Sequence, residues 1–384
     1  MTVEAANPPS DPPIERKAFA RTKVVCRSGI VFGLLVASAS WLVGDRAWAF
    51  DLIAQVTAQI GVVSVVFAAW CFVRRRWALA LVAGLSVVLA VAAIVPGRDL
   101  GLADVNPTRA DGGGPVRVLV YNANAGNENR ERVRAVVTSA QADVVGLLEA
   151  PAWLVDELRE GGVWRERYPY YFVSDRAGAG FKIVLSRWPQ HRVTDGRRGE
   201  RFTLVGGLRH MLFDRPEGAF AFTLLHPKSP RTPERWQAGN EVVGGLVDRH
   251  RDYVSARGIA HVVASDLNAT PSGSRSKALA RAGLRRAKPL LTPAGTFPAW
   301  LPGPASIAID DVVVSPRVVV QQWRTAPGGG SDHRAVVVDL WVPAPTGEVE
   351  LSDEPRPRRS ATRRTSYAPL QETHRGPTPA RRGP

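Results

Sequence analysis

Three apolar runs in the first hundred residues restrict what this chain can fold into more than any other feature. They cover Ser28–Gly44, Leu52–Val73 and Trp77–Val95. A transmembrane helix needs ~20 mostly apolar residues, and these runs come close to that length. No small-residue cleavage site follows the first run and two more runs come after it, which favours a membrane anchor over a cleaved signal peptide. The sequence therefore predicts three transmembrane helices within residues 28–95.

Lysine and arginine indicate which way these helices point. Five such residues precede the first run, within residues 1–27, and Arg74–Arg76 fill the turn between the second and third runs, whereas the link between the first two has Arg46 alone. An excess of positive charge marks the cytoplasmic side of a membrane. We therefore expect a cytoplasmic N-terminus in a bacterial cell membrane and, after three crossings, a chain that continues outside it. Both cysteines, Cys26 and Cys71, then lie near the cytoplasmic face, where thiols stay reduced.

Composition divides the rest of the chain into three parts. Residues 96–115 are rich in Gly, Pro and Asp without an apolar period, which is typical of a flexible linker. Residues 116–343 contain apolar strands and helical stretches, and we expect them to form one domain. Residues 344–384 are first acidic and then rich in Arg and Pro, which is typical of a disordered basic tail. The net charge is +15, but residues 355–384 alone carry +7 of it, so basicity says little about a site in the domain.

Strands outnumber helices in residues 116–343. A β-branched run predicts a strand at Val116–Tyr121, and helical spacing predicts a long helix from Pro233 to about Arg257. The helices fall between groups of strands, which favours an α/β fold of two packed sheets with helices outside them. The other expected strands are Asp143–Leu148, Tyr170–Val173, Ile183–Leu185, Phe202–Leu208, Phe220–Leu225, Ala260–Ala264, Ile307–Val314, Val318–Trp323 and Ala335–Trp341, and the other expected helices are Glu128–Ala140 and Pro151–Arg159.

Polar side chains gather at the ends of the predicted strands, where active sites commonly lie. They are carboxylates and amides together with two histidines, without a thiol. Hard oxygen ligands favour Mg²⁺ or Mn²⁺ over Zn²⁺. Such an ion offsets charge on phosphoryl oxygens while imidazoles move protons, so the set suits hydrolysis of a phosphate ester. The candidates are Asn122, Asn124, Glu149, His226, Asp266, Asn268, Asp310, Asp311, Asp332 and His333.

The order of these motifs resembles that of the endonuclease/exonuclease/phosphatase superfamily. Along the chain come Asn122, the LLE that ends at Glu149, SRWP, HP, DLNATP, IDD and SDH. The DLNATP and SDH elements are the most specific of these. The resemblance covers Val116 to Trp341 and implies a four-layer α/β/β/α sandwich.

The same resemblance implies a metal site and a hydrolytic centre. Glu149 matches the principal metal ligand, and Asn122 matches the asparagine that helps to hold the metal and the phosphate. Asp332 matches an aspartate that either joins the metal site or orients a histidine. Asp266 matches the aspartate that orients or deprotonates the attacking water. Asn268 matches the residue that contacts the phosphoryl oxygens. Mg²⁺ is the implied cofactor, with Mn²⁺ as a substitute.

Two histidines complete the implied catalytic set. His226 matches a general acid or transition-state donor, and His333 matches the histidine that binds the phosphate or assists proton transfer. Asp310 matches the aspartate that pairs with a catalytic histidine, but the adjacent Asp311 leaves open which carboxylate does so. Two basic residues could read the substrate phosphate, Lys228 and Arg231.

Three further positions are assigned less directly. Asn124 is a second choice as a ligand, and Arg187 of the SRWP motif is expected to be structural. Ser265 replaces the glycine that usually precedes the aspartate, which alters the turn without removing a ligand.

The flanking segments point to a class of substrate. Three spans followed by an external domain resemble the VanJ-type membrane phosphatases linked to glycopeptide resistance, which implies a polyprenyl pyrophosphate or another phosphate-bearing lipid or polymer at the membrane. Two alternatives remain. One is an extracytoplasmic Mg²⁺-dependent nuclease, because a basic chain suits contacts with a phosphate backbone. The other is a membrane sensor or scaffold that keeps the fold without turnover.

Overall fold

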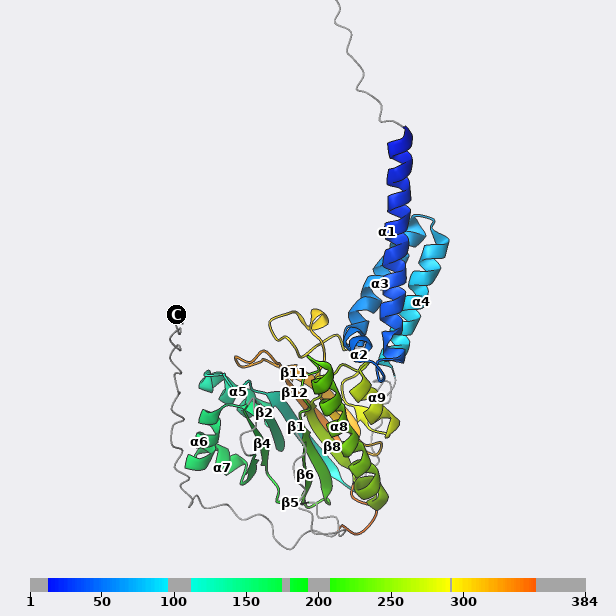
Figure 1. Ribbon diagram of the computed structural model, residues 1–384. Coiled ribbons are helices and arrows are strands. Elements are labelled where there is room, and N and C mark those ends of the chain that lie inside the picture. Colours follow the sequence, from blue (N-terminus) through cyan, green and yellow to red (C-terminus); the bar gives the residue numbers. More distant parts are fainter. Residues whose placement is uncertain (1–12, 96–111, 175–179, 193–207, 291, 350–384) are drawn as a thin grey trace, which may run out of the picture.

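The computed structural model describes residues 13–95, 112–174, 180–192, 208–290 and 292–349 (Figure 1). The expected basic tail from residue 350 onward and most of the expected linker lie outside these ranges, as does the predicted strand Phe202–Leu208 except for its last residue. The boundaries of the domain and its linker therefore stay predictions. What the structure describes is a bundle of N-terminal helices beside a sandwich of two sheets.

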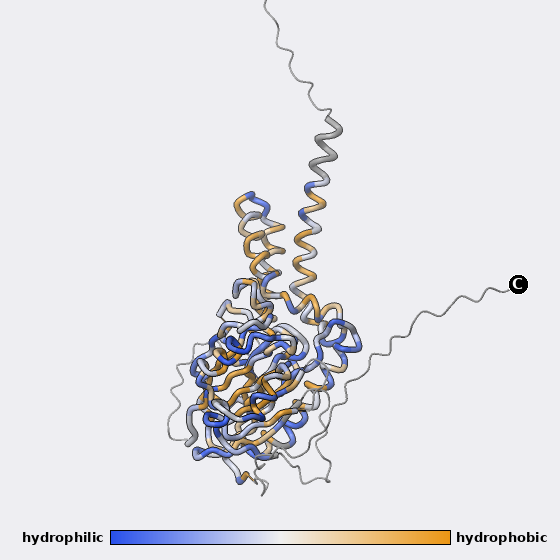
Figure 2. Tube along the Cα trace, turned by 90° about the vertical axis from the view of Figure 1, so that its left-hand side faces the viewer, coloured by the Kyte–Doolittle hydropathy of each residue, from blue (hydrophilic) through white to orange (hydrophobic). Residues whose placement is uncertain are grey.

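The N-terminal helices are apolar on their outer surfaces. In order they are α1 (Pro13–Ala39), a 3₁₀ turn η1 (Ser40–Leu42), α2 (Trp48–Ala54), α3 (Thr57–Val73) and α4 (Trp77–Ile94). Two stretches, Thr22–Leu42 and Trp77–Ile94, are each long and apolar enough to cross a membrane. Orange dominates these helices in Figure 2, and side chains such as Leu81 are largely exposed, as in a surface that faces lipid.

The second predicted span, Leu52–Val73, is broken rather than continuous. The helix stops after Ala54, and α2 and α3 meet at an angle of 60°, so they make a third span only if the bent pair counts as one. The break has a physical reason. Asp51 and Gln55 point their polar groups at the sandwich, where they find hydrogen-bond partners that a lipid phase could not supply.

Each sheet has six strands, and the two have related topologies. The first sheet has the order β11-β12-β1-β2-β4-β3 and the second β5-β6-β7-β8-β10-β9. The pairs β1–β2 and β7–β8 are parallel and the other pairs are antiparallel. The bounds are β1 (Gly114–Asn122), β2 (Val144–Ala150), β3 (Tyr170–Val173), β4 (Phe181–Ser186), β5 (Gln190–Arg192), β6 (Leu208–Phe213), β7 (Phe220–Leu225), β8 (His261–Asp266), β9 (Arg285–Arg286), β10 (Asp310–Val314), β11 (Val319–Ala326) and β12 (Ala335–Val342).

Three apolar layers hold the sandwich together, which confirms the predicted α/β/β/α architecture. Between the sheets, alternate residues such as Val118, Leu224 and Val262 pack into one core. Helices cover the outer faces over two further cores. The first sheet carries α5 (Arg130–Ala140), α6 (Ala152–Glu160) and α7 (Val163–Arg167), and the second carries α8 (Pro233–Arg249) and α9 (Ser274–Arg281), with a π-helical turn η3 (His250–Val254) after α8.

The sandwich is docked on the N-terminal helices through α2. Asp51 is 2% exposed and accepts three hydrogen bonds, from the backbone and hydroxyl of Ser274 at 2.7 and 2.8 Å and from Trp236 Nε1 at 2.8 Å. Gln55 Oε1 accepts the amide of Thr270 at 2.6 Å, and Trp48 Nε1 donates to a carbonyl after β7 at 2.8 Å. A buried carboxylate with three donors is a specific contact. The loops that follow β7 and β8 therefore rest on α2.

Candidate active site

One edge of the sandwich brings together polar residues from both sheets. Asn122 ends β1, Glu149 lies near the end of β2, Asp266 ends β8, and His226 comes directly after β7. Asn122 Nδ2 donates to Glu149 Oε1 at 3.3 Å and to Asp266 Oδ2 at 3.0 Å, which connects the two sheets. His226 Nε2 lies 3.5 Å from the same Glu149 oxygen and 3.6 Å from the same Asp266 oxygen. Four of the predicted residues thus form one cluster.

A buried histidine–aspartate pair borders this cluster. His333 Nδ1 lies 2.8 Å from Asp310 Oδ2 and 3.9 Å from Asp266 Oδ2. Burial alone would lower the pKa of His333, but the charges of Asp310 and Asp266 outweigh it and raise the pKa to about 10. His333 is therefore a cation at neutral pH and donates through Nδ1 to Asp310. The arrangement answers the question that the sequence left open, because Asp310 and not Asp311 pairs with the histidine.

At His226 the effect of burial on the pKa outweighs that of the nearby carboxylates, which is the opposite of the balance at His333. Burial lowers the pKa of His226, and the nearby carboxylates of Asp266 and Glu149 only partly offset this effect. The positive charge of Lys182 lowers it further. The two imidazoles therefore differ, with His226 neutral and His333 charged.

Asp266, Asp310 and His333 are buried and offer ligand atoms that lie within 4.8 Å of one another. Such a group could in principle hold a metal ion. However, the Nδ1 of His333 that contributes to it already carries a proton shared with Asp310, and a protonated nitrogen cannot ligate a metal. The Glu149 carboxylate, which contacts the same Asn122 amide as Asp266, is the better ligand for a hard cation.

Left-handed backbone places three of the predicted residues. Asn124, Glu149 and Asn268 have φ values of 62°, 47° and 48°, a region that side chains other than glycine seldom adopt. At Glu149 the pairing of β2 with β4 shifts register between Leu147 and Ala150, as in a β-bulge. A bulge redirects a side chain, and here it turns the Glu149 carboxylate towards Asn122. Backbone strain of this kind is common at functional sites.

Loop contacts hold the remaining predicted ligands in place. Asn124 Nδ2 donates to Asp332 Oδ1 at 3.1 Å, and Asp332 is exposed. The amide of Asn268 donates to Asp266 Oδ1 at 2.9 Å, and its side chain donates to the carbonyl of Pro227 at 3.2 Å. Asn268 thereby connects the loop after β8 to the loop that carries the first histidine.

Several predicted residues lie outside the cluster. Asp311 is fully buried in an ion pair with Arg286 at 2.8 Å, and it also accepts a hydrogen bond from Trp323 Nε1 at 3.0 Å. This partner set gives Asp311 a structural place. Arg187 pairs with Asp143 at 2.8 Å, in line with its expected structural role. Two other residues, Lys228 and Arg231, are exposed. The hydroxyl of Ser265 donates to the Asp311 carbonyl at 3.1 Å.

The sequence reasoning missed three residues that surround the site. Lys182 on β4 is half-buried, and burial lowers its pKa to about 8. Phe297 packs its ring on His333 with centroids 4.8 Å apart, and Thr296 Oγ1 accepts the amide of Asp310 at 3.1 Å. A lysine inside the apolar run FKIVLS was a visible signal. The loop residues gave none, because the sequence does not say which loop folds back over the histidine.

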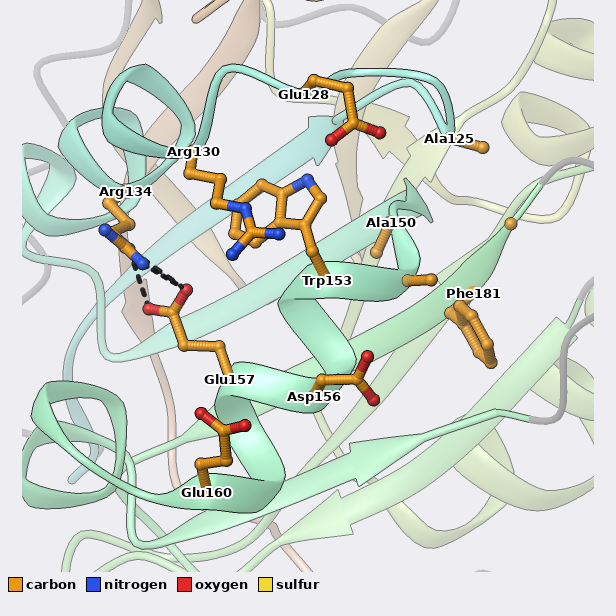
Figure 3. Close-up of a pocket in the computed structure, with 12 residues that line it drawn as sticks. Ala125, Glu128, Arg130, Arg134, Ala150, Trp153, Asp156, Glu157, Glu160 and Phe181 are labelled. Carbon is orange, nitrogen blue, oxygen red and sulfur yellow. Dashed lines mark hydrogen bonds and ion pairs between the residues drawn. The ribbon is translucent and has the colours of Figure 1, made fainter. Parts of the chain in front are cut away.

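A hollow of about 610 Å³ lies beside the cluster, between α5 and α6 (Figure 3). Ala150, which follows Glu149 in the chain, lines it together with Trp153, whose ring lies under the Arg130 guanidinium at 5.4 Å. The ion pair of Arg134 and Glu157 at 2.8 Å closes its far wall. The hollow is therefore a neighbour of the candidate site rather than the site itself.

Comparison with known proteins supplies the family. The pattern of the endonuclease/exonuclease/phosphatase family matches residues 119–333, more than half of the chain, and the chain belongs to this family. The fold is that of DNase I-like proteins. No curated protein sequence matches the chain.

Solved structures with similarity to this chain come from several organisms. They include an endonuclease/exonuclease/phosphatase from Beutenbergia cavernae (20% identity, 60% of this chain, 72% of that chain, TM-score 0.42). Another is truncated Caenorhabditis elegans TDP2, with 16% identity over 59% of this chain and 98% of that chain and a TM-score of 0.45. A third is a mannosyl-6-phosphatase from Bacteroides thetaiotaomicron, with 17% identity over 59% of this chain and 99% of that chain and a TM-score of 0.43. At these identities the resemblance concerns the fold alone.

Proposed function

We propose that this protein is a membrane-anchored, divalent-metal-dependent hydrolase of phosphate esters or pyrophosphates. The observation that carries the proposal is the shared cluster at the edge of the sandwich, where Asn122 hydrogen-bonds both Glu149 and Asp266. Two carboxylates within reach of one amide and one imidazole need a compensating positive charge. Family membership supports the reaction class, because members of this family are hydrolases that act on phosphate esters.

The donor set fits a hard cation such as Mg²⁺. The groups that would hold it are oxygens of Glu149, with Asn122 and Asp332, and none of them is a soft ligand. When bound, the ion supplies positive charge to the phosphoryl oxygens.

The chain's own residues act around that ion. Asp266, held at the end of β8, orients the attacking water and accepts its proton. Asn268, tied to Asp266 by its backbone amide, turns towards the phosphoryl oxygens. His333, kept protonated by Asp310, donates a hydrogen bond to the phosphate. Neutral His226 offers an N–H donor to the charge that develops on the transferred group.

We infer that the substrate is a phosphate-bearing lipid or polymer at the outer surface of the cytoplasmic membrane, with a polyprenyl pyrophosphate as the specific candidate. Two observations support this choice. The positive residues from Arg16 to Arg27, in the N-terminal part of α1, and those at Arg74–Arg76 favour a cytoplasmic N-terminus. Asp51 and Gln55 hold the segment that follows Asp266 against the N-terminal helices, and Trp48 holds the loop that carries His226.

A substrate panel tests the proposal. The full chain, purified in detergent, is assayed with Mg²⁺ on a polyprenyl pyrophosphate, a soluble phosphodiester, DNA and RNA, before and after EDTA. We expect hydrolysis of the lipid substrate, its loss in EDTA and its recovery with Mg²⁺ or Mn²⁺. Glu149→Gln should lower turnover by about 10²-fold or more, and Glu128→Gln, an exposed change nearby, should leave it intact.

The same panel separates the alternatives. Strong, salt-sensitive cleavage of DNA without lipid hydrolysis would replace the lipid substrate by a nuclease. Equal, negligible turnover of the wild type and Glu149→Gln on every substrate would support a sensor or scaffold instead.

A further inference from the structure

One surface outside the membrane helices is apolar, exposed and close to the catalytic histidine. Among the described residues, the large apolar side chains that are strongly exposed lie within residues 24–91, with one exception. That exception is Trp300, which is 77% exposed. It belongs to a segment between β9 and β10, residues 292–306, that we call the Trp300 loop. In Figure 1 this yellow loop rises to the level of α2.

The composition of the Trp300 loop is unusual for an exposed segment of this chain. Its sequence TPAGTFPAWLPGPAS has no charged residue, although 22% of the whole chain is charged. Pro302 and Pro304 are exposed beside Trp300. Tryptophan prefers the boundary between the lipid headgroups and the hydrocarbon, because its ring is apolar and its N–H is polar. A loop that faces only water usually contains charged residues, and this loop has none.

The exposure of Trp300 is built into a rigid loop. The guanidinium of Arg334 donates to the carbonyls of Gly295, Ala299 and Leu301 and to the hydroxyl of Ser306, and these bonds tie both sides of the loop together. The same Ser306 hydroxyl donates to the carbonyl of Pro298 at 3.0 Å. A loop fixed in this way presents its tryptophan outward in its resting state.

The Trp300 loop connects the membrane helices with the catalytic residues. On one side, Gln59 in the first turn of α3 donates to the carbonyl of Ser306 at 3.4 Å. On the other side, Phe297 packs on the ring of His333, and the amide of Ala299 donates to the carbonyl of Asp332 at 2.7 Å. The loop therefore lies where α3 leaves the sandwich, at the height where a bilayer around α3 begins.

We propose that the Trp300 loop is a membrane-contact surface that seats Trp300 in the headgroup layer of the bilayer spanned by α3 and α4. The occupant of this surface is phospholipid, because the loop contacts the first turn of α3 and carries no charged residue that would suit a polar partner. The loop sets the distance of His333 from the membrane surface, so the phosphate that the site cleaves lies in the headgroup layer. This inference rests on the proposed membrane anchorage and names the substrate class of the proposed site.

A fluorescent label at position 300 tests the contact without requiring turnover. The full chain carries Cys26→Ala and Cys71→Ala, and Trp300→Cys is labelled with an environment-sensitive fluorophore. The protein is reconstituted into vesicles of phosphatidylcholine and phosphatidylglycerol. We expect a blue-shifted emission that a nitroxide on the lipid headgroup quenches strongly and aqueous iodide quenches weakly. Glu217→Cys, in the exposed turn before β7 at the opposite end of that strand, is the matched control and should show the reverse.

The outcomes separate the inference from the proposed function. Equal quenching patterns at positions 300 and 217 would overturn the lipid contact, and so would shielding of position 300 from both quenchers, which would indicate cover by another protein or a second copy. In a second measurement, Trp300→Ala should lower hydrolysis of a vesicle-embedded substrate several-fold while a soluble phosphodiester is cleaved at the wild-type rate. Lipid contact at position 300 in a chain without any hydrolysis would leave this surface in place and reject the catalytic proposal instead.

Discussion

Three histidines that pack against one another make the stability of this protein depend on pH. His210, Thr223 and His261 lie on neighbouring strands under α8, and His250 begins the turn after that helix. His210 Nδ1 lies 2.6 Å from Thr223 Oγ1, that oxygen lies 2.8 Å from His261 Nε2, and His261 Nδ1 lies 3.2 Å from His250 Nδ1. His250 and His261 are buried and His210 is half-buried, so a proton added to any of the three rings would be poorly solvated.

The size of the effect follows from the pKa values. Burial, with added repulsion from Arg249 and His250, lowers the pKa of His210 to about 3. Burial and the other two histidines bring the pKa of His261 well below its ordinary 6.5. These histidines bind protons in the unfolded chain as the pH falls through 6.5 but not in the native chain, so their contribution to stability is complete above pH 6.5 and is lost below it. His210 then removes about 1.4 kcal/mol per pH unit.

The loss at acidic pH is large on the scale of protein stability. At pH 4.5, two units below 6.5, His210 alone removes about 2.7 kcal/mol and His261 adds to this loss, against a total of roughly 5–15 kcal/mol for an ordinary domain. Urea unfolding of the detergent-solubilised chain, followed by near-UV circular dichroism from pH 7.5 to 4.5, measures it. His210→Gln should reduce the slope below pH 6.5 by about 1.4 kcal/mol per unit. An unchanged slope in both His210→Gln and His261→Gln would refute the reasoning.

Three further predictions concern the site and its support. Asp310→Asn removes the main partner of the His333 cation, so kcat should fall by about 10²-fold and the alkaline limb of the pH–rate profile should move to lower pH, as measured by steady-state kinetics. Lys182→Met removes a positive charge that lowers the pKa of His226, so the acid limb of the pH profile of kcat/KM should shift to higher pH. The control Arg187→Met, which removes a charge from an ion pair nearby in the chain, should leave this limb unchanged. Asp51→Asn weakens the charge-assisted hydrogen bonds to Ser274 and Trp236 by about 2 kcal/mol. Hydrogen exchange at the Ser274 amide should therefore become roughly 30-fold faster. Unchanged exchange would contradict the docking of the sandwich on α2.

Much of the sandwich could be predicted from the sequence, because buried strands such as Val144–Ala150 are continuous apolar runs. The cluster could be predicted in part for the same reason, since Asn122 and Asp266 each end such a run. Which of Asp310 and Asp311 pairs with the histidine could not be predicted. Neighbouring residues on a strand point to opposite faces, and the sequence does not say which face meets the histidine.

Contacts between distant segments account for the other differences. The helix breaks after Ala54 because Asp51 and Gln55 bond to residues more than two hundred positions further along the chain. The apolar pattern alone therefore predicts one straight span. Lys182 looks like an ordinary strand residue until the register of β2 and β4 places it near Glu149. Periodicity describes single elements, and these features arise between elements.

The apolar core between the two sheets also sets the distance between the candidate catalytic residues. Glu149 and His333 come from one sheet and Asp266 and His226 from the other, so the gap between the sheets decides whether they meet. Gly146 keeps this gap narrow, since a Cβ there would lie 2.7 Å from Leu224 Cδ1. Substitutions that thicken this layer, even far from any polar group, should impair turnover before they unfold the chain. Evolution of rate in such a protein can therefore proceed through apolar residues that never touch a substrate.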